Sequence, residues 1–459
     1  MLFNSQIFIF IFLPLTVFCF YKTSLQSNRI KILILGSLIF YAYWDIRFLP
    51  LLLVSIIFNW LIANIFIKFR NNTIIYTGVL FNLLIIGIFK YLNFFSEILI
   101  NFTDQDFERF NLILPLGISF FTFQQISYLI DLKRNQIAKY NFYEYLLYVS
   151  FFPQLIAGPI VRHNQIIHQF RQCHLITNVH EYISRGLVLF SLGLFKKIYL
   201  ADRLAPLADA GFEFALGPDP ISTFFAWFSA LSFTLQLYFD FSAYSDMAIG
   251  LGFMFGLKIP INFNIPYLST NIQSFWRRWH ITLSSFFRDY LYIPFGGSRS
   301  GEIKYIFSII ITTSFCGLWH GAEWSFILWG SLHGIGLIIY HYWKRLNFSM
   351  PVFISWFITF IFVVCGWVLF RAENATLAYE IIKSMFIYNG TQFPSKYIPT
   401  LDFVFIALLL SILGPDNITL ALKKFRANIW TLFLTASILT YVTLSMMAEP
   451  SQEFIYFQF

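Results

Sequence analysis

The sequence predicts an all-α protein that crosses a membrane many times. Of its 459 residues, 58% are hydrophobic and only 12% are charged, whereas roughly a quarter of the residues are charged in ordinary soluble domains. Apolar runs long enough to cross a hydrocarbon core of roughly 30 Å recur along the chain. A soluble domain of this length cannot cover so much apolar surface. The composition therefore excludes a soluble enzyme, a secreted disulfide scaffold and a disordered protein.

The apolar runs predict the membrane spans in order. They lie at residues 6–21, 32–44, 48–67, 73–100, 112–132, 144–160, 221–257, 305–319, 324–343, 353–370, 402–414 and 428–447. The short loops between them carry Lys and Arg, as expected of loops on the cytoplasmic side. We expect about ten to twelve crossings, because several runs are short or broken. In the run 144–160, Pro153 and Ala157-Gly158-Pro159 break a helix, so a re-entrant or broken segment is predicted there.

One integral membrane domain is predicted over residues 1–459, with N-terminal spans at 1–140, a core at 144–345 and C-terminal spans at 346–459. The net charge of +8 is spread over short loops, which argues against a nucleic-acid partner. The polar stretch 162–185 holds several histidines but lacks tight spacing or carboxylate partners. We interpret it as a cytoplasmic loop with a surface helix, and we predict no metal site.

Ionisable residues at membrane depth are costly, so each is a candidate for function. The first candidate is His320, in Leu318-Trp319-His320-Gly321. An imidazole titrates near neutral pH and is a natural general base for a hydroxyl group. The alternative is a histidine packed in a helix contact, because Gly317 and Gly321 form a GxxxG spacing. The residue types alone favour this packing interpretation.

The second candidate is the run from Phe275 to His280. On a helix, Arg277 and Ser284 lie on the same face as His280, and Trp276 and Trp279 favour a helix at the membrane interface. Such a helix either brings His280 and its arginines to an anionic donor or intermediate, or is a basic surface helix without chemistry. Both interpretations stay open.

The third candidate is the segment 240–246. Asp240 and Asp246 point about 120° apart on a helix and so do not form a catalytic dyad. Ser242 and Asp246 share a face and are spaced to bond each other. The favoured interpretation is structural, with carboxylates that tie helices together. The alternative is that they orient a catalytic histidine.

Motifs for other chemistries are missing from the sequence. It contains no Gly-x-Ser-x-Gly elbow, no Walker loop and no HExxH zinc motif. A transfer reaction without ATP-binding machinery must draw on a donor that is already activated, such as a thioester.

Together, the motifs resemble those of the membrane-bound O-acyltransferases, in their bacterial alginate O-acetyltransferase branch. They are Leu114-Pro115-Leu116-Gly117, Ala157-Gly158-Pro159-Ile160, Ala201-Asp202-Arg203, the segment 238–252, Asn262-Phe263-Asn264, Phe275-Trp276-Arg277-Arg278-Trp279-His280, Arg288-Asp289-Tyr290 and Gly317-Leu318-Trp319-His320-Gly321. The resemblance covers nearly the whole chain. It implies a ring of about ten to twelve transmembrane helices around a thinned centre, with short broken or interfacial helices. In this fold a funnel and a tunnel meet near the two histidines.

The resemblance also implies roles for individual residues. His320 matches the histidine taken as the catalytic base, and His280 matches the second histidine that assists it. The expected donor-binding or supporting residues are Arg277, Trp276, Trp319, Asp240, Asp246 and Ser242. No bound cofactor is expected, because the acyl donor, acetyl-CoA or an acyl-carrier thioester, is a substrate.

The expected function is O-acyl transfer, in particular of acetyl, from a cytoplasmic thioester to an extracytoplasmic polysaccharide such as alginate or another exopolysaccharide. The expected location is the bacterial inner membrane, in contact with lipid. The resemblance to related branches of the family implies a partner, a periplasmic acetyltransferase of the SGNH type. The alternatives are D-alanyl transfer to teichoic acid, acetyl transfer to peptidoglycan, a transporter or flippase without chemistry, and a scaffold that recruits periplasmic enzymes.

Overall fold

The structure, a computed structural model, describes residues 1–103, 110–134, 139–448 and 452–455. These residues form helices and connecting loops, and no strand occurs among them. The all-α prediction is therefore confirmed. The described chain forms two compact units, each assembled from segments far apart in sequence. Unit 1 comprises residues 1–192, 245–260 and 421–448, and unit 2 comprises residues 193–244, 261–420 and the described part of 449–459. The prediction of one domain with boundaries near residues 140 and 345 stays a prediction.

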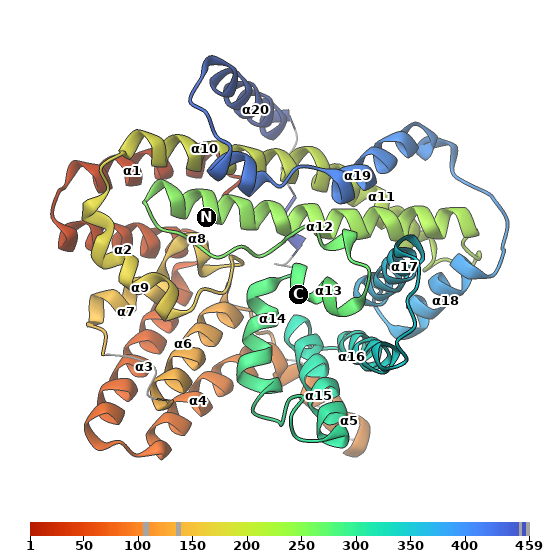
Figure 1. Ribbon diagram of the computed structural model, residues 1–459, viewed down its shortest axis with the longest axis horizontal. Coiled ribbons are helices and arrows are strands. Elements are labelled where there is room, and N and C mark those ends of the chain that lie inside the picture. Colours follow the sequence, from red (N-terminus) through yellow and green to blue (C-terminus); the bar gives the residue numbers. More distant parts are fainter. Residues whose placement is uncertain (104–109, 135–138, 449–451, 456–459) are drawn as a thin grey trace. The chain divides into compact units, whose positions relative to one another are not determined.

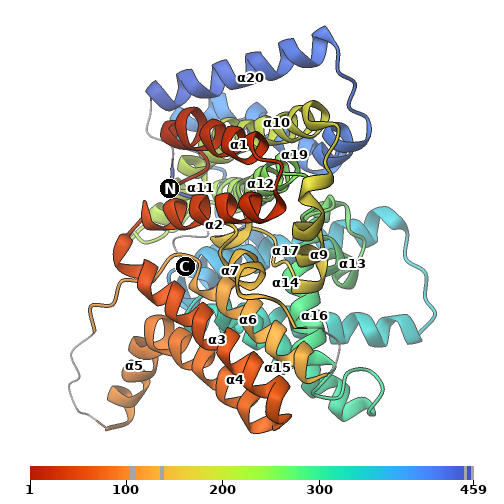
Figure 2. The ribbon, with the colours of Figure 1, turned by 90° about the vertical axis from the view of Figure 1, so that its left-hand side faces the viewer.

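Unit 1 holds the N-terminal helices. They are η1 (Phe8–Phe12), α1 (Leu13–Lys22), α2 (Gln26–Ala42), η2 (Ile46–Phe48), α3 (Leu49–Phe69), α4 (Asn72–Ile86), η3 (Gly87–Tyr91), α5 (Leu92–Thr103), α6 (Ile118–Lys133), α7 (Phe142–Ser150), α8 (Phe152–Leu155), α9 (His163–Gln172), η4 (Cys173–Leu175), most of α10 (Val179–Phe195), and α20 (Ile429–Ala448). Helices α3, α4 and α6 lie side by side (Figures 1 and 2). The predicted break in the run 144–160 is confirmed, because α7 ends at Ser150 and only the four-residue α8 follows.

Unit 2 holds the helices around the two predicted site histidines. They are η5 (Lys196–Ala201), α11 (Asp202–Phe214), α12 (Thr223–Met254), which continues into unit 1, η6 (Pro266–Leu268), α13 (Ile272–Arg278), α14 (Ile281–Phe287), η7 (Arg288–Tyr292), α15 (Glu302–His320), α16 (Trp324–Arg345), α17 (Val352–Arg371), α18 (Ala375–Phe386), η8 (Ser395–Thr400) and α19 (Leu401–Leu413), followed by η9 (Thr419–Lys423) at the boundary between the units.

Two glycines let α15 and α16 pack closely as a hairpin (Figure 1). A Cβ atom at Gly317 would lie 2.0 Å from the carbonyl oxygen of Phe326, and one at Gly330 would lie 2.1 Å from that of Thr313. Only residues without a side chain allow the backbones to approach so closely. The helix contact that the GxxxG spacing predicts is therefore confirmed at Gly317. It fixes the position of the end of α15, where His320 lies.

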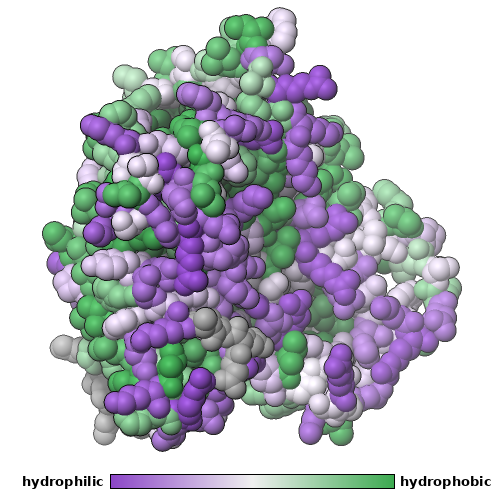
Figure 3. All heavy atoms as spheres, turned by 60° about the vertical axis from the view of Figure 1, so that its left-hand side comes forward, coloured by the Kyte–Doolittle hydropathy of each residue, from purple (hydrophilic) through white to green (hydrophobic). Residues whose placement is uncertain are grey.

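Within the described part of the chain, six helical segments are long and apolar enough to cross a membrane. They are Ile46–Phe69, Asn72–Ile100, Glu302–His320, Val352–Arg371, Ser395–Leu413 and Ile429–Ala448. Other predicted spans form shorter helices, such as α1 and α6, which have 10 and 16 residues. Large apolar side chains are exposed along the long candidate spans, including Val54 and Leu61 on α3. In the view of Figure 3, hydrophobic side chains flank a stretch of hydrophilic ones. This is the surface expected of a multi-pass membrane protein.

Candidate active site

His320 is the last residue of α15, and its side chain is buried, with 6% of its surface exposed. Three aromatic rings surround the imidazole: the ring centroids of Trp319, Trp329 and Phe370 lie 4.8, 5.2 and 5.3 Å from its own. These rings come from α15, α16 and α17, so the helix hairpin and α17 together build an aromatic wall around His320.

His280 is held in a left-handed backbone conformation, with φ of 41° and ψ of 55°. Such a conformation costs a residue with a Cβ atom roughly 1–2 kcal/mol. Backbone hydrogen bonds from Ile281 to Asn262 and from Asn264 to Arg278, both 2.9 Å, hold the chain on either side. Strain of this kind is tolerated where the surrounding structure enforces it, which is typical of functional sites.

The Asn262 side chain orients the imidazole of His280. Its Oδ1 atom lies 3.1 Å from Nδ1 of His280 and also accepts hydrogen bonds from the backbone N–H and the hydroxyl of Thr282, at 3.2 and 2.9 Å. An atom that accepts from a backbone N–H is an oxygen, so Nδ1 of His280 carries the proton. The other ring nitrogen, Nε2, is then the basic one in the neutral ring.

Trp319 contacts both histidines. Its ring centroid is 4.8 Å from that of His320 and 6.1 Å from that of His280, and Phe241 also packs against His280, at 4.7 Å. The structure therefore brings together His320, His280 and Trp319, three of the predicted site residues. The sequence separates the two histidines by forty residues and contains no signal for this contact.

The structure corrects the predicted helix through His280. That helix places Arg277, His280 and Ser284 on one face, but α13 ends at Arg278 and α14 begins at Ile281. The left-handed conformation of His280 separates the two short helices. Arg277 is exposed on the last turn of α13, whereas His280 is fully buried. The prediction of a common helical face for these three residues was therefore wrong. The left-handed conformation that ends the helix could not be foreseen, because it has no sequence signature in a residue other than glycine.

Trp276 belongs to a second aromatic cluster, which adjoins the first. Its ring lies 5.8 Å from that of Trp329 and 5.2 Å from that of His333, and the rings of Trp329 and His333 lie 4.8 Å apart. Because Trp329 also contacts His320, the two clusters share one indole. His333 is not among the residues predicted from the sequence, although the rule for ionisable residues in apolar runs applies to it as well.

A cavity of about 390 Å³ in unit 2 adjoins this second cluster. Its lining includes the exposed cations Arg288 and Lys344. It also includes the buried residues Thr312 and Cys316 of α15, together with Trp276. Cys316 lies one helical turn before His320, about 6 Å along the axis. The cavity thus extends from exposed positive charges toward the end of α15 that carries His320.

Asp240 lies in a buried ion-pair cluster. Nζ of Lys197 is 2.9 Å from Asp240 Oδ1 and 2.8 Å from Asp202 Oδ1, and Lys197 is 2% exposed. Oδ2 of Asp240 also accepts a 2.6 Å hydrogen bond from the backbone of Ile455. This cluster ties α12, η5 and the C-terminal segment together, in agreement with the structural interpretation of the carboxylate. Lys197 is a further residue that the sequence analysis did not select.

The other two residues of that segment are also buried on α12, with Ser242 at 2% and Asp246 at 6% exposure. The Ser242 hydroxyl donates to the carbonyl oxygen of Phe239 at 3.5 Å, one turn earlier on the helix. The predicted bond between Ser242 and Asp246 was therefore wrong. A serine in an apolar helix readily bonds a carbonyl of the preceding turn.

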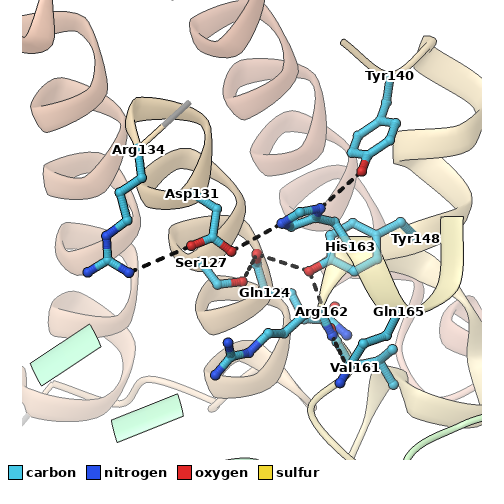
Figure 4. Close-up of polar contacts among 10 residues, drawn as sticks. All are labelled: Gln124, Ser127, Asp131, Arg134, Tyr140, Tyr148, Val161, Arg162, His163 and Gln165. Carbon is cyan, nitrogen blue, oxygen red and sulfur yellow. Dashed lines mark hydrogen bonds and ion pairs between the residues drawn. The ribbon is translucent and has the colours of Figure 1, made fainter. Parts of the chain in front are cut away.

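Unit 1 has a separate polar cluster around His163 (Figure 4). Nε2 of His163 lies 3.1 Å from Asp131 Oδ2, and Nδ1 lies 3.0 Å from the hydroxyl of Tyr140. The hydroxyl of Tyr148 bonds the carbonyl oxygens of Gln124 and Val161 at 3.2 and 3.3 Å. The predicted surface helix is α9, and this cluster attaches its first residue to α6. We interpret this cluster as structural, because each ring nitrogen of His163 has a hydrogen-bond partner within the protein.

Comparison with known proteins identifies the family. Residues 117–379 match the membrane-bound O-acyltransferase family. The chain belongs to this family. Among its relatives, the peptidoglycan O-acetyltransferase of Helicobacter pylori is 43% identical over 432 residues, which cover 85% of this chain and 81% of that protein. The probable alginate O-acetylase AlgI of Pseudomonas aeruginosa is 40% identical over 85% of this chain and 76% of that protein. The teichoic acid D-alanyltransferase of Bacillus subtilis is 27% identical over 57% of this chain and 70% of that protein.

The family resemblance expected from the motifs is thus confirmed, and this membrane-bound O-acyltransferase is an acyltransferase enzyme. The matched region contains both predicted site histidines, the aromatic rings around them and the cavity beside Trp276. The roles of the individual residues stay predictions.

Proposed function

We propose that this protein transfers an acetyl group from a cytoplasmic thioester to hydroxyl groups of an extracytoplasmic polysaccharide, with His320 as the general base. The observation that carries the proposal is the convergence of His320 and His280 on Trp319 in a buried aromatic site. Two imidazoles approach one indole from separate elements, and one of them has a strained backbone conformation. This arrangement supports a chemical role beyond packing.

In the proposed reaction, the ring of His320 accepts the proton of the acceptor hydroxyl while the oxygen attacks the thioester carbonyl carbon. The carbon–sulfur bond then breaks, and the proton passes to the leaving sulfur, so that the products are an ester and a thiol. Positioned proton transfer of this kind contributes about 10² to 10⁴ in rate. His280, held by Asn262 through Nδ1, orients the donor in its neutral form, and in its protonated form it stabilises the developing oxyanion through Nε2–H. The hydroxyl that attacks belongs to the polysaccharide or to a protein that relays the acyl group.

The cavity beside Trp276 suits the thioester donor. Both acetyl-CoA and an acyl carrier present the thioester on a narrow arm that carries phosphate, and Arg288 and Lys344 line the exposed part of the cavity. Phosphate groups are bound preferentially by such side chains. Arg277, Trp276 and Trp319 are the proposed supporting residues for the donor, and Asp240, Asp246 and Ser242 support the fold around it.

The proposed location is the bacterial inner membrane, because the donor is cytoplasmic and the acceptor is outside. The proposed partner is a periplasmic SGNH-type acetyltransferase that completes the transfer. For the acceptor, the names of the two relatives suggest either an exopolysaccharide like alginate or the glycan of peptidoglycan. We propose an exopolysaccharide, and the test below separates it from peptidoglycan.

The test is mass spectrometry of the purified exopolysaccharide and of digested peptidoglycan from cells with the gene, without it, and with a His320→Gln copy. The expected result is an acetyl mass on the exopolysaccharide that disappears without the gene and is not restored by His320→Gln. A His174→Gln copy is the matched control, because His174 is exposed and lies in unit 1. Loss of acetyl groups from peptidoglycan alone would show that the acceptor is peptidoglycan and not an exopolysaccharide. Unchanged acetylation of both polymers would refute the function.

A transporter or a scaffold predicts a different outcome for the same cells. Either function tolerates a polar residue of similar size at position 320, provided that the variant inserts into the membrane at the wild-type level. Normal acetylation with His320→Gln at that level would therefore favour these alternatives over catalysis.

A further inference from the structure

His333 is a buried imidazole that neither the fold nor the proposed reaction explains. It lies on α16 with none of its surface exposed, and neither of its ring nitrogens has a hydrogen-bond partner among the described residues. Five aromatic rings surround it: Phe275, Trp276, Trp329, Phe362 and Trp367. A phenylalanine would fill the same space without burying two polar atoms, so packing alone does not account for a histidine here.

A second buried polar atom faces the same spot as His333. The indole Nε1 of Trp329 likewise has no partner among the described residues, and Trp329 is fully buried. Gly366 on α17 shows where the two groups converge. A Cβ atom at this position would lie 3.0 Å from Nε2 of His333 and 3.7 Å from Nε1 of Trp329. Both nitrogens therefore face the same point of the α17 backbone, where a side chain larger than that of glycine would crowd them.

These groups are suited to one small hydrogen-bonding oxygen. The indole N–H can only donate, whereas a neutral imidazole nitrogen donates or accepts. A water molecule or a carbonyl oxygen matches this pair, and buried polar groups in proteins are regularly satisfied in this way. The spot also matters for the site, because the Trp329 ring also packs edge-on against His320, with the ring centroids 5.2 Å apart.

We propose that His333 is a positioning residue for acyl transfer: with the indole N–H of Trp329 it holds one hydrogen-bonding oxygen beside Gly366, and so fixes the ring against which His320 packs. This inference rests on the proposed function. The oxygen comes either from an ordered water molecule or from an amide carbonyl on the arm of the thioester donor, since Trp276 contacts His333 and also lines the cavity.

The test uses the purified full-length protein in lipid nanodiscs together with the proposed periplasmic acetyltransferase, with acetyl-CoA as donor and the exopolysaccharide as acceptor, and it measures kcat, KM for the donor and the unfolding temperature. In His333→Phe we expect the unfolding temperature to stay the same or rise, because an apolar ring replaces two buried polar nitrogens that have no partner among the described residues. We expect kcat to fall about tenfold or more, the loss of one well-placed hydrogen bond near a reacting group. In His333→Gln, whose amide nitrogen reaches the position of Nε2, we expect most of kcat to return.

Gly366→Ala is the second variant, and it does not change the histidine. Its methyl group would occupy the spot between the two nitrogens, so kcat should fall as in His333→Phe. The matched control is Gly36→Ala in unit 1, whose Cβ atom would be similarly tight, 3.3 Å from Thr16 Cγ2, and whose activity should follow the wild type.

The kinetic constants distinguish the sources of the oxygen. A lower kcat with an unchanged KM supports a water molecule, and a raised KM for acetyl-CoA supports a carbonyl of the donor. Wild-type kcat and KM in either His333→Phe or Gly366→Ala would overturn the inference. Two further arms separate this failure from failure of the proposed function: an inactive wild type, or an active His320→Gln, refutes the function itself.

Discussion

The close contact between α15 and α16 makes a quantitative prediction for Gly317→Ala. The new methyl carbon would lie 2.0 Å from the carbonyl oxygen of Phe326, whereas ordinary van der Waals contact begins at 3.4 Å. Because the obstacle is backbone, the helices must separate by about 1 Å or more. Overpacking of this kind costs roughly 1–3 kcal/mol of stability.

The effect on activity should exceed the effect on folding. His320 lies three residues beyond Gly317 at the end of the same helix, so a shift of α15 displaces the imidazole from its contacts with Trp329 and Phe370. A misplacement of about 1 Å at a reacting group lowers the rate on the order of 10²-fold. We therefore expect kcat to fall about 100-fold in protein that still inserts and unfolds cooperatively.

The assay is acetyl transfer to the exopolysaccharide by purified protein in nanodiscs together with the proposed periplasmic acetyltransferase, with the folded fraction measured by size-exclusion chromatography and thermal unfolding. Gly87→Ala is the matched control, because a Cβ atom there meets nothing within 4 Å, and its activity should equal that of the wild type. A Gly317→Ala protein with wild-type kcat would refute the argument that this glycine contact positions His320.

Three further substitutions have expected outcomes. Asn262→Leu removes the hydrogen-bond acceptor for His280 and Thr282, so kcat should fall at least tenfold. Asn262→Asp keeps an acceptor and should retain more activity. Equal rates for the two variants would contradict the positioning role of Asn262. Lys197→Met leaves Asp202 and Asp240 without their buried cation and should lower the free energy of unfolding by about 3–5 kcal/mol. Detergent extracts should then contain little folded protein, and a normal yield of folded protein would contradict this prediction. His163→Leu breaks the bonds to Asp131 and Tyr140 and should lower the unfolding temperature of the protein without changing KM for the donor, whereas a changed KM would show that this cluster contacts the substrate.

Much of the fold follows from the sequence, because apolar runs and their breaks are local properties. The helix after residue 301 and the broken segment at Pro153 depend on residues within one or two turns. The close contact at Gly317 is made with another helix, but the glycine spacing that indicates it is also local. The same local reasoning fails at His280. Its left-handed conformation is enforced by Asn262, which lies eighteen residues earlier, and no pattern in the run 275–284 reveals it.

The candidate site shows the same division. The motifs point to His320 and His280 separately, but their common contact with Trp319 is a tertiary property that only the structure reveals. Lys197 and His333 lie in largely apolar stretches, where the cost of an ionisable group at membrane depth already marks them as candidates. Their partners, two carboxylates in one case and a ring of aromatic side chains in the other, come from elements distant in sequence.

The most direct test of His320 as the general base is acetyl transfer across the membrane of sealed proteoliposomes, with labelled acetyl-CoA on one side and the acceptor polysaccharide with the proposed periplasmic acetyltransferase on the other. We predict label on the polysaccharide with wild-type protein and with His174→Gln, and none above background with His320→Gln at equal incorporation. Transfer by His320→Gln at the wild-type rate would contradict the account.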